Sequence, residues 1–142
     1  MNDCVFCRII RRELPASVVY EDDETLAFLD LRQPSAAHVL VVPKFHVETI
    51  FDLESELAAR LMQTVVLTAC AVRKSLGPAG VNLWQSNGRA AGQEVPHVHV
   101  HVLAREEGDG LFPMYSQPPP LPEGEALDRL AASIRAGFGE PS

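Results

Sequence analysis

Short apolar runs separated by turn residues make up much of the chain, and they predict β-strands. Two runs lie on either side of the acidic turn 22–24 and predict a hairpin, because turn residues interrupt two β-type segments. A third run ends at Pro43, which cannot donate a hydrogen bond to a ladder. Two more runs follow in the second half of the chain. The expected strands are 17–21, 25–30, 38–43, 81–86 and 97–103.

Between Asp52 and Leu76 the apolar positions change to helical spacing, with Asp52 as a candidate N-cap and Gly77 with Pro78 as the stop. A helix that packs on one sheet needs a single apolar stripe of about 100°. This segment has two adjacent rows, so the second row predicts another packing surface, most simply the same helix in a homodimer. The rows are Leu57, Leu61, Val65, Ala69, Val72 and Leu76, and Ala58, Met62, Val66 and Cys70.

The last part of the chain has a different composition. A proline-rich stretch around 118–122 precedes a short amphipathic segment, which predicts a helix over 123–136. Too little chain follows the prolines to fold alone. We therefore expect one domain over 1–110, with 111–142 packed on it as a covering segment.

Composition and charge narrow the classes of function. The 142 residues are 46% hydrophobic and 22% charged, as in a soluble globular domain. A net charge of -7 argues against DNA or RNA as a partner. Neither a signal peptide nor an apolar run of about 20 residues is present, so no membrane association is expected. Three cysteines without a disulfide pattern suit a reducing compartment, and we expect a cytoplasmic protein.

Three histidines alternate with valines in the last expected strand. In a strand His97, His99 and His101 would share one face, and the valines would enter the core from the other. A purification tag does not explain an internal run interleaved with valine. A row of imidazoles suits metal binding or nucleophilic and acid–base catalysis, and both can coexist if the histidines have different roles.

The run HVHVHVL, preceded by GQEVP, resembles the motif of the histidine triad family of nucleotidyl hydrolases and transferases. The segment VFCRIIRRELPASVVYEDDETLAFLDLRQPSAAHVLVVPKFH is also similar to the Hint branch, and the resemblance runs from about Asp3 to Arg105. It implies an α+β fold: an antiparallel sheet of about five strands, one long helix and a C-terminal helix. The sheet would continue across a dimer.

By this resemblance His99 is the nucleophile that attacks the α-phosphorus and briefly carries the nucleotide. Its other ring nitrogen would donate to a backbone carbonyl near His97, which keeps the attacking nitrogen unprotonated. His101 and His38 match the histidines beside the α-phosphate. Gln93 matches a glutamine near the phosphate bridge, and Asn87 an amide near the phosphate or ribose. Ordinary loop polarity is the alternative for these two amides.

The resemblance also implies a nucleoside site. Asp30 matches a carboxylate that accepts hydrogen bonds from ribose hydroxyls. Phe28 lies two residues before Asp30 on the same expected strand and so faces the same way. Simple core packing is the better interpretation for Ile9 and Leu14. The positions that match the apolar walls around the base are Phe6, Ile9, Leu14, Phe28 and Leu31.

Cys4 and Cys7 have the spacing with which two thiolates hold one tetrahedral ion. Similarity to zinc-bearing bacterial relatives implies His46 and His97 as the other two ligands of a closed, structural Zn²⁺ site. A reduced, metal-free thiol pair is the alternative. Cys70, in the middle of the long helix, is expected to be a small core residue.

Two departures from the family pattern concern the leaving group. Glu94 stands where relatives have a hydroxyl residue, and the tail has no tryptophan, since Trp84 is the only one in the chain. The leading expectation is a hydrolase of nucleoside phosphoramidates or related nucleoside monophosphate derivatives, with a purine nucleotide as ligand. The alternatives are a diadenosine polyphosphate hydrolase and a non-enzymatic nucleotide-sensing interaction protein.

Overall fold

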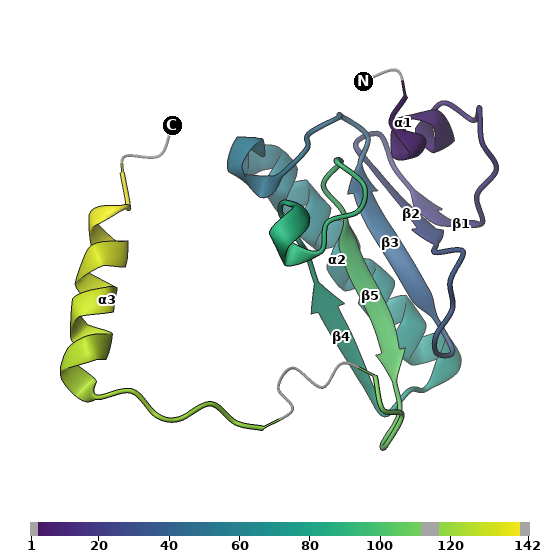
Figure 1. Ribbon diagram of the computed structural model, residues 1–142. Helices are drawn as coiled ribbons and strands as arrows, with labels where there is room; N and C mark the ends of the chain where they lie inside the picture. Colours follow the sequence, from purple (N-terminus) through teal and green to yellow (C-terminus); the bar gives the residue numbers. More distant parts are fainter. Residues whose placement is uncertain (1–2, 112–116, 140–142) are drawn as a thin grey trace. The chain divides into compact units, whose positions relative to one another are not determined.

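The computed structural model describes residues 3–111 and 117–139, which divide into two compact units at residues 109 and 110. Figure 1 labels the helices and strands. Short 3₁₀ turns occupy Ile50–Asp52 and Arg89–Ala91. The first unit contains α1 (Val5–Ile10), β1 (Val18–Glu21), β2 (Thr25–Leu29), β3 (His38–Pro43), α2 (Ser55–Leu76), β4 (Gly80–Trp84) and β5 (Val100–Arg105).

The five strands form one sheet in the order β1-β2-β3-β5-β4, and every neighbouring pair is antiparallel. The β1–β2 hairpin turns at Asp22, whose Oδ1 accepts hydrogen bonds from the backbone N–H groups of Glu24 and Thr25. The expected α+β fold with a five-stranded antiparallel sheet is confirmed.

Side chains on the two faces of the sheet pack into two separate cores. On one face α2 crosses the sheet (Figure 1), and its Leu61 and Val65 pack with alternating valines of β3 and β5. On the other face α1 places Phe6 and Ile9 against Phe28 and other apolar residues of β2 and β3. Because both faces of the central strands are covered, their sequences are nearly continuous apolar runs.

The long helix has one packed side and one open side. By length and composition α2 would be apolar enough to cross a membrane, but Leu61, Val65 and Val72 lie in the sheet core. Met62 and Val66, from the second row, are about half exposed, and Cys70 is exposed rather than a core residue. The homodimer predicted from this second row stays a prediction.

Several element boundaries differ from those expected. The α2 helix begins at Ser55, because Ile50–Asp52 forms a separate 3₁₀ turn. Its end is as predicted: Gly77 adopts the left-handed conformation, with φ 60°, and its N–H bonds to the Arg73 carbonyl. The helix α1 was not predicted, since six residues are too few to show a helical period.

The histidine segment is only partly a strand. The expectation of a strand over 97–103 is wrong at its beginning, because β5 starts at Val100 and runs to Arg105. Before it, the N–H of Val98 bonds to the carbonyl of Val47, and the N–H of His97 to that of Val95. These residues therefore bond to loop backbone instead of the β3–β5 ladder.

The second unit contains α3 (Gly124–Ala136), close to the predicted 123–136. Its apolar residues Leu127, Leu130 and Ile134 recur at helical spacing, and each is more than half exposed. The packing of this segment on the first unit stays a prediction.

Candidate active site and metal cluster

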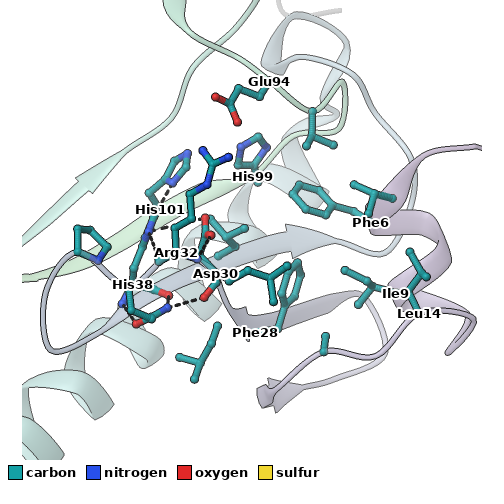
Figure 2. Close-up of a pocket in the computed structure, with 18 of the residues that line it drawn as sticks. Phe6, Ile9, Leu14, Phe28, Asp30, Arg32, His38, Glu94, His99 and His101 are labelled. Atoms are coloured by element: carbon teal, nitrogen blue, oxygen red, sulfur yellow. Dashed lines mark hydrogen bonds and ion pairs between the residues drawn. The ribbon is translucent and has the colours of Figure 1, made fainter.

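A pocket of about 950 Å³ opens on the sheet face that carries α1 (Figure 2). One part of its wall is apolar and the other is polar. The apolar wall includes Phe6, Ile9, Leu14, Phe28 and Leu40, and the polar wall includes Asp30, Arg32, His38, Glu94, His99 and His101.

His99 is buried in the wall of this pocket, with 6% of its surface exposed. Its Nδ1 lies 2.7 Å from the carbonyl oxygen of His97, so Nδ1 carries the proton and donates to it. Burial lowers the pKa of His99 below its ordinary value, although this hydrogen bond opposes the shift. The neutral ring therefore keeps an unprotonated Nε2, which is the form that a nucleophilic histidine requires.

His38 and His101 form a hydrogen-bonded pair beside His99. His38 Nδ1 lies 3.2 Å from the Arg32 carbonyl and donates to it, which leaves Nε2 as an acceptor. That Nε2 is 2.9 Å from His101 Nδ1, which must then be the donor. Burial is the main cause that lowers the pKa of His101 to about 4. In the neutral pair, His101 Nε2 therefore carries no proton.

Trp84 and Arg32 are pocket residues that the sequence analysis did not identify. Trp84 pairs with His101 across β4 and β5, and the two rings stack with centroids 4.1 Å apart and planes 3° from parallel. Arg32 follows Asp30 in the loop after β2. The strand register could have indicated Trp84, but only after the β4–β5 pairing was known.

The predicted nucleoside residues gather in the same pocket. Phe6 and Phe28 meet edge to face, with ring centroids 5.5 Å apart, and Asp30 follows directly after β2. Ile9 lines the pocket while it is also part of the core. Leu31 lines the pocket but is 98% exposed, so it provides an open edge instead of a packed wall.

Two predicted polar residues do not line the pocket. The Oε1 of Gln93 accepts from the Gly88 N–H, and its Nε2 donates to the carbonyls of Glu48 and Val95. Asn87 Oδ1 accepts from the Ile50 N–H. Both amides thus hold the loop before β5 to neighbouring backbone. Neither residue is among those that line the pocket, and their assignment to phosphate contacts stays a prediction.

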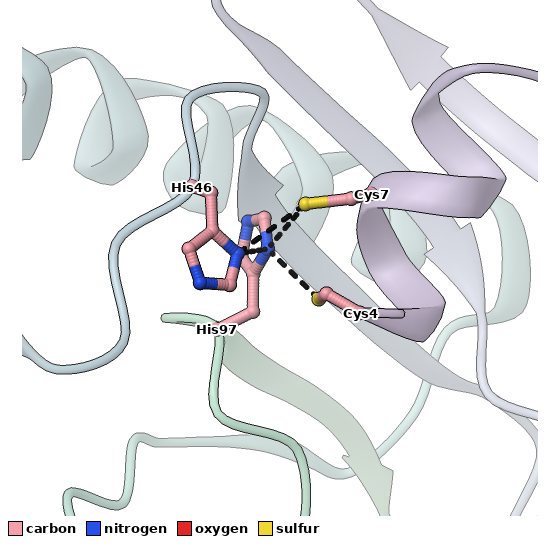
Figure 3. Close-up of side chains that lie close together, drawn as sticks. All are labelled: Cys4, Cys7, His46 and His97. Carbon is pink, nitrogen blue, oxygen red and sulfur yellow. Dashed lines mark hydrogen bonds between the residues drawn. The ribbon is translucent and has the colours of Figure 1, made fainter. Parts of the chain in front are cut away.

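Cys4, Cys7, His46 and His97 form a second cluster (Figure 3), in which one ligand atom of each lies within 4.8 Å of the others. The Nδ1 atoms of His46 and His97 are 3.2 Å apart. Cys7 Sγ is 3.3 Å from His46 Nδ1, and Cys4 Sγ is 3.5 Å from His97 Nδ1. The four residues come from α1 and its N-cap Cys4, the loop after β3 and the segment before β5.

These separations match those expected around one tetrahedral zinc ion. Bonds of about 2.0–2.1 Å to nitrogen and about 2.3 Å to sulfur place two nitrogens about 3.3 Å apart and nitrogen and sulfur about 3.6 Å apart. The Nε2 of His97 donates to the Pro43 carbonyl at 2.8 Å, so its Nδ1 presents a lone pair to the cluster. Burial lowers the pKa of His97 to about 4, which also favours the neutral ring. The residues therefore fit a bound Zn²⁺.

The fold and the pocket define an α+β domain with a histidine-lined cavity, and similarity to known proteins identifies its family. The family model described as HIT domain matches residues 11–108. The chain is 38% identical to "Protein hit" of Bacillus subtilis over 134 residues, which cover 94% of this chain and 92% of that protein. It is 34% identical to the purine nucleoside phosphoramidase of Escherichia coli over 114 residues, or 80% and 93% of the two chains.

Solved structures agree with this result. A HIT family protein from Bacillus subtilis superposes with a TM-score of 0.89 at 34% identity, covering 97% of this chain and 99% of that one. The chain belongs to the HIT domain family.

Proposed function

We propose that this protein hydrolyses nucleoside phosphoramidates or closely related nucleoside monophosphate derivatives through a nucleotide bound covalently to His99. The observation that carries the proposal is the His99 ring: its Nδ1 donates to the His97 carbonyl, which leaves Nε2 unprotonated, and the residue lines a large pocket. The proposal is also supported by the E. coli relative, named as a purine nucleoside phosphoramidase, and a fission-yeast relative named as an adenosine 5'-monophosphoramidase.

In the first step, His99 Nε2 attacks the α-phosphorus. A nitrogen–phosphorus bond to His99 forms, the bond from phosphorus to the leaving amine breaks, and the amine departs with a proton taken from water. The fixed hydrogen bond to the His97 carbonyl stabilises the positive ring that results, because its Nδ1–H already points at an acceptor.

In the second step, water attacks the same phosphorus. The bond to His99 breaks, the water loses a proton to solvent, and a nucleoside monophosphate leaves. The balance of both steps is one water consumed, with its hydroxyl on phosphorus and its hydrogen on the amine. His99 returns to the neutral form, which its lowered pKa favours.

The nucleoside would occupy the apolar part of the pocket. The base would lie against the wall that Phe6 and Phe28 form, which supplies aromatic area, and Ile9 belongs to the same apolar cluster. Asp30 is then near enough to the catalytic histidines to accept hydrogen bonds from the ribose. The name of the E. coli relative, a purine nucleoside phosphoramidase, supports a purine as the base.

We also propose that Cys4, Cys7, His46 and His97 hold a structural Zn²⁺, as in the zinc-bearing branch of the family. The ion would tie α1 to the segment that carries His99. With four protein ligands it leaves no position for a water, so it takes no part in the reaction. The reduced thiols that it needs suit the cytoplasm, which we propose as the location.

The open side of α2 supports the further proposal of a homodimer. Met62 and Val66 are about half exposed on a helix whose other side is packed, and a second copy of the helix would cover them. Sedimentation of the purified chain tests this point.

The decisive experiment is intact mass spectrometry of protein mixed with adenosine phosphoramidate and quenched in milliseconds. We expect a species heavier by one adenylyl group, mapped by fragmentation to His99 and missing in the matched variant His99→Ala. Turnover of the same substrate in the His99→Ala protein at the wild-type rate would contradict the mechanism. A parallel assay measures the turnover of diadenosine tetraphosphate. Faster turnover of this substrate than of adenosine phosphoramidate would favour the alternative, a diadenosine polyphosphate hydrolase.

A further inference from the structure

The charges around the pocket are uneven. Among the described residues that line it, Arg32 is the only lysine or arginine, while Asp30 and Glu94 are carboxylates. The whole chain is acidic, with a net charge of -7. A phosphate that enters this pocket therefore meets two negative groups and one positive group.

The backbone of Arg32 is held on both sides by pocket residues. Its N–H donates to Asp30 Oδ1 at 2.8 Å, and its carbonyl accepts from His38 Nδ1 at 3.2 Å. In Figure 2 the side chain extends toward the rings of His99 and His101. Within residues 3–111 and 117–139, no ion pair involves its guanidinium. An arginine is thus anchored at its base, directed at the histidines and left without an anionic partner.

In their neutral forms, the rings of His99 and His101 present neither an N–H donor nor a positive charge to a phosphate. His99 Nε2 must be unprotonated to attack, and the hydrogen-bonded pair of His38 and His101 leaves His101 Nε2 without a proton. Burial also lowers the pKa of His101 to about 4, so this ring brings no positive charge at neutral pH. Phosphoryl transfer depends mainly on positioning and neutralising the phosphate oxygens.

We propose that Arg32 is the phosphate-binding residue of the pocket and that its guanidinium donates to the non-bridging oxygens of the α-phosphate. A guanidinium can bind two such oxygens at once, which also fixes the phosphorus relative to His99. The ligand class that follows is a nucleoside with a 5'-phosphoryl group, bound much more tightly than the nucleoside alone. This inference rests on the proposed function, since it assigns the anion site of the same pocket.

The test measures the binding of two ligands, AMP and adenosine, by isothermal titration calorimetry at constant salt. Arg32→Gln removes the charge and keeps a hydrogen-bonding side chain, and Arg32→Lys keeps the charge without the planar fork. Arg60→Gln is the matched control, because Arg60 pairs with Glu24 and does not line the pocket. Each glutamine variant changes the net charge equally, so general repulsion is the same in both.

We expect Arg32→Gln to weaken AMP binding about tenfold or more, as the loss of a charged hydrogen bond does, and to change adenosine binding less than twofold. Arg32→Lys should fall between wild type and Arg32→Gln, and Arg60→Gln should equal wild type for both ligands. Unchanged AMP affinity in Arg32→Gln would show a solvated surface charge and overturn the proposal. An equal loss for adenosine would overturn it too, by showing a role in the shape of the loop.

The two proposals fail in different ways. If wild type forms the adenylyl-His99 species and Arg32→Gln binds AMP normally, only the Arg32 assignment is wrong. If wild type binds neither AMP nor adenosine, the proposed function is wrong and the anion site with it.

Discussion

The two histidine clusters of this protein are built from neighbouring residues but have opposite properties. His97 and His99 are separated by one valine, and both rings are buried and have lowered pKa values. The His97 ring lies beside two thiols and the His46 ring, and one ligand atom of each of the four residues lies within 4.8 Å of the others. The His99 ring forms part of the wall of an open pocket.

The difference lies in which ring nitrogen the backbone occupies. The Pro43 carbonyl takes the Nε2–H of His97, so Nδ1 is free for the cysteines. The His97 carbonyl takes the Nδ1–H of His99, so Nε2 is free for a phosphorus atom. Each ring thus has one backbone hydrogen bond, and the two bonds select opposite tautomers. This makes His97 a candidate metal ligand and His99 a candidate nucleophile.

The largest expected effect separates catalysis from stability. His99→Asn should lower the turnover of adenosine phosphoramidate at least about 10³-fold, because an amide cannot replace the nucleophile. Its melting temperature and its AMP affinity should stay close to those of wild type. Steady-state kinetics and calorimetry check this. Residual activity near the wild-type level would contradict the proposed difference between the two histidines, because His99 would then not be the nucleophile.

The second largest effect is the loss of metal and stability when a cysteine of the Cys4, Cys7, His46 and His97 cluster is replaced. Cys7→Ser should lose the metal, from about one zinc per chain to near zero by elemental analysis. It should also lower stability by roughly 3 kcal/mol or more, as loss of a structural metal does. The control is Cys70→Ser, an exposed cysteine outside the cluster. Equal melting temperatures for both variants, together with no zinc in wild type, would contradict a structural metal.

The pH dependence of catalysis is the third effect. Burial lowers the pKa of His99 below 6.5, so the ring stays neutral and kcat/KM should remain constant as pH falls through 6.5. Below the lowered pKa the ring gains a proton, and kcat/KM should then fall about tenfold per pH unit. A pH profile of kcat/KM measures this. An acidic limb centred at or above 6.5 would show that burial does not control this histidine.

The smallest effect concerns the residue that contacts both clusters. The ring of Phe6 meets His99 at 5.1 Å and His97 at 5.8 Å between centroids. Phe6→Leu should raise KM severalfold, since the base loses an aromatic wall, and should lower stability by about 1 kcal/mol. Kinetics and urea denaturation report the two changes. A change in kcat alone would mean that Phe6 orients His99 instead of binding the nucleoside.

Local chemistry made much of the fold and part of the site predictable. Each strand was predicted from its apolar run, and the end of α2 was predicted from Gly77. The alternation of histidine and valine predicted that the valines enter the core, and Val98, Val100 and Val102 all lie in the core beneath α2. Phe28 and Asp30 were predicted from the family resemblance and from their spacing of two residues, and both line the pocket.

Only the tertiary structure decided the rest. The cysteines lie about 90 residues from His97 in the chain, and no local pattern states that α1 brings them to that ring. Asn87 and Gln93 bond to the backbone of Ile50 and Glu48, which lie about 40 residues away, and no local pattern shows these bonds. Trp84 and Arg32 become pocket residues only through strand pairing and the loop after β2. The order of residue types sets which bonds a side chain is able to form. Packing between segments remote in sequence decides which of those bonds it does form.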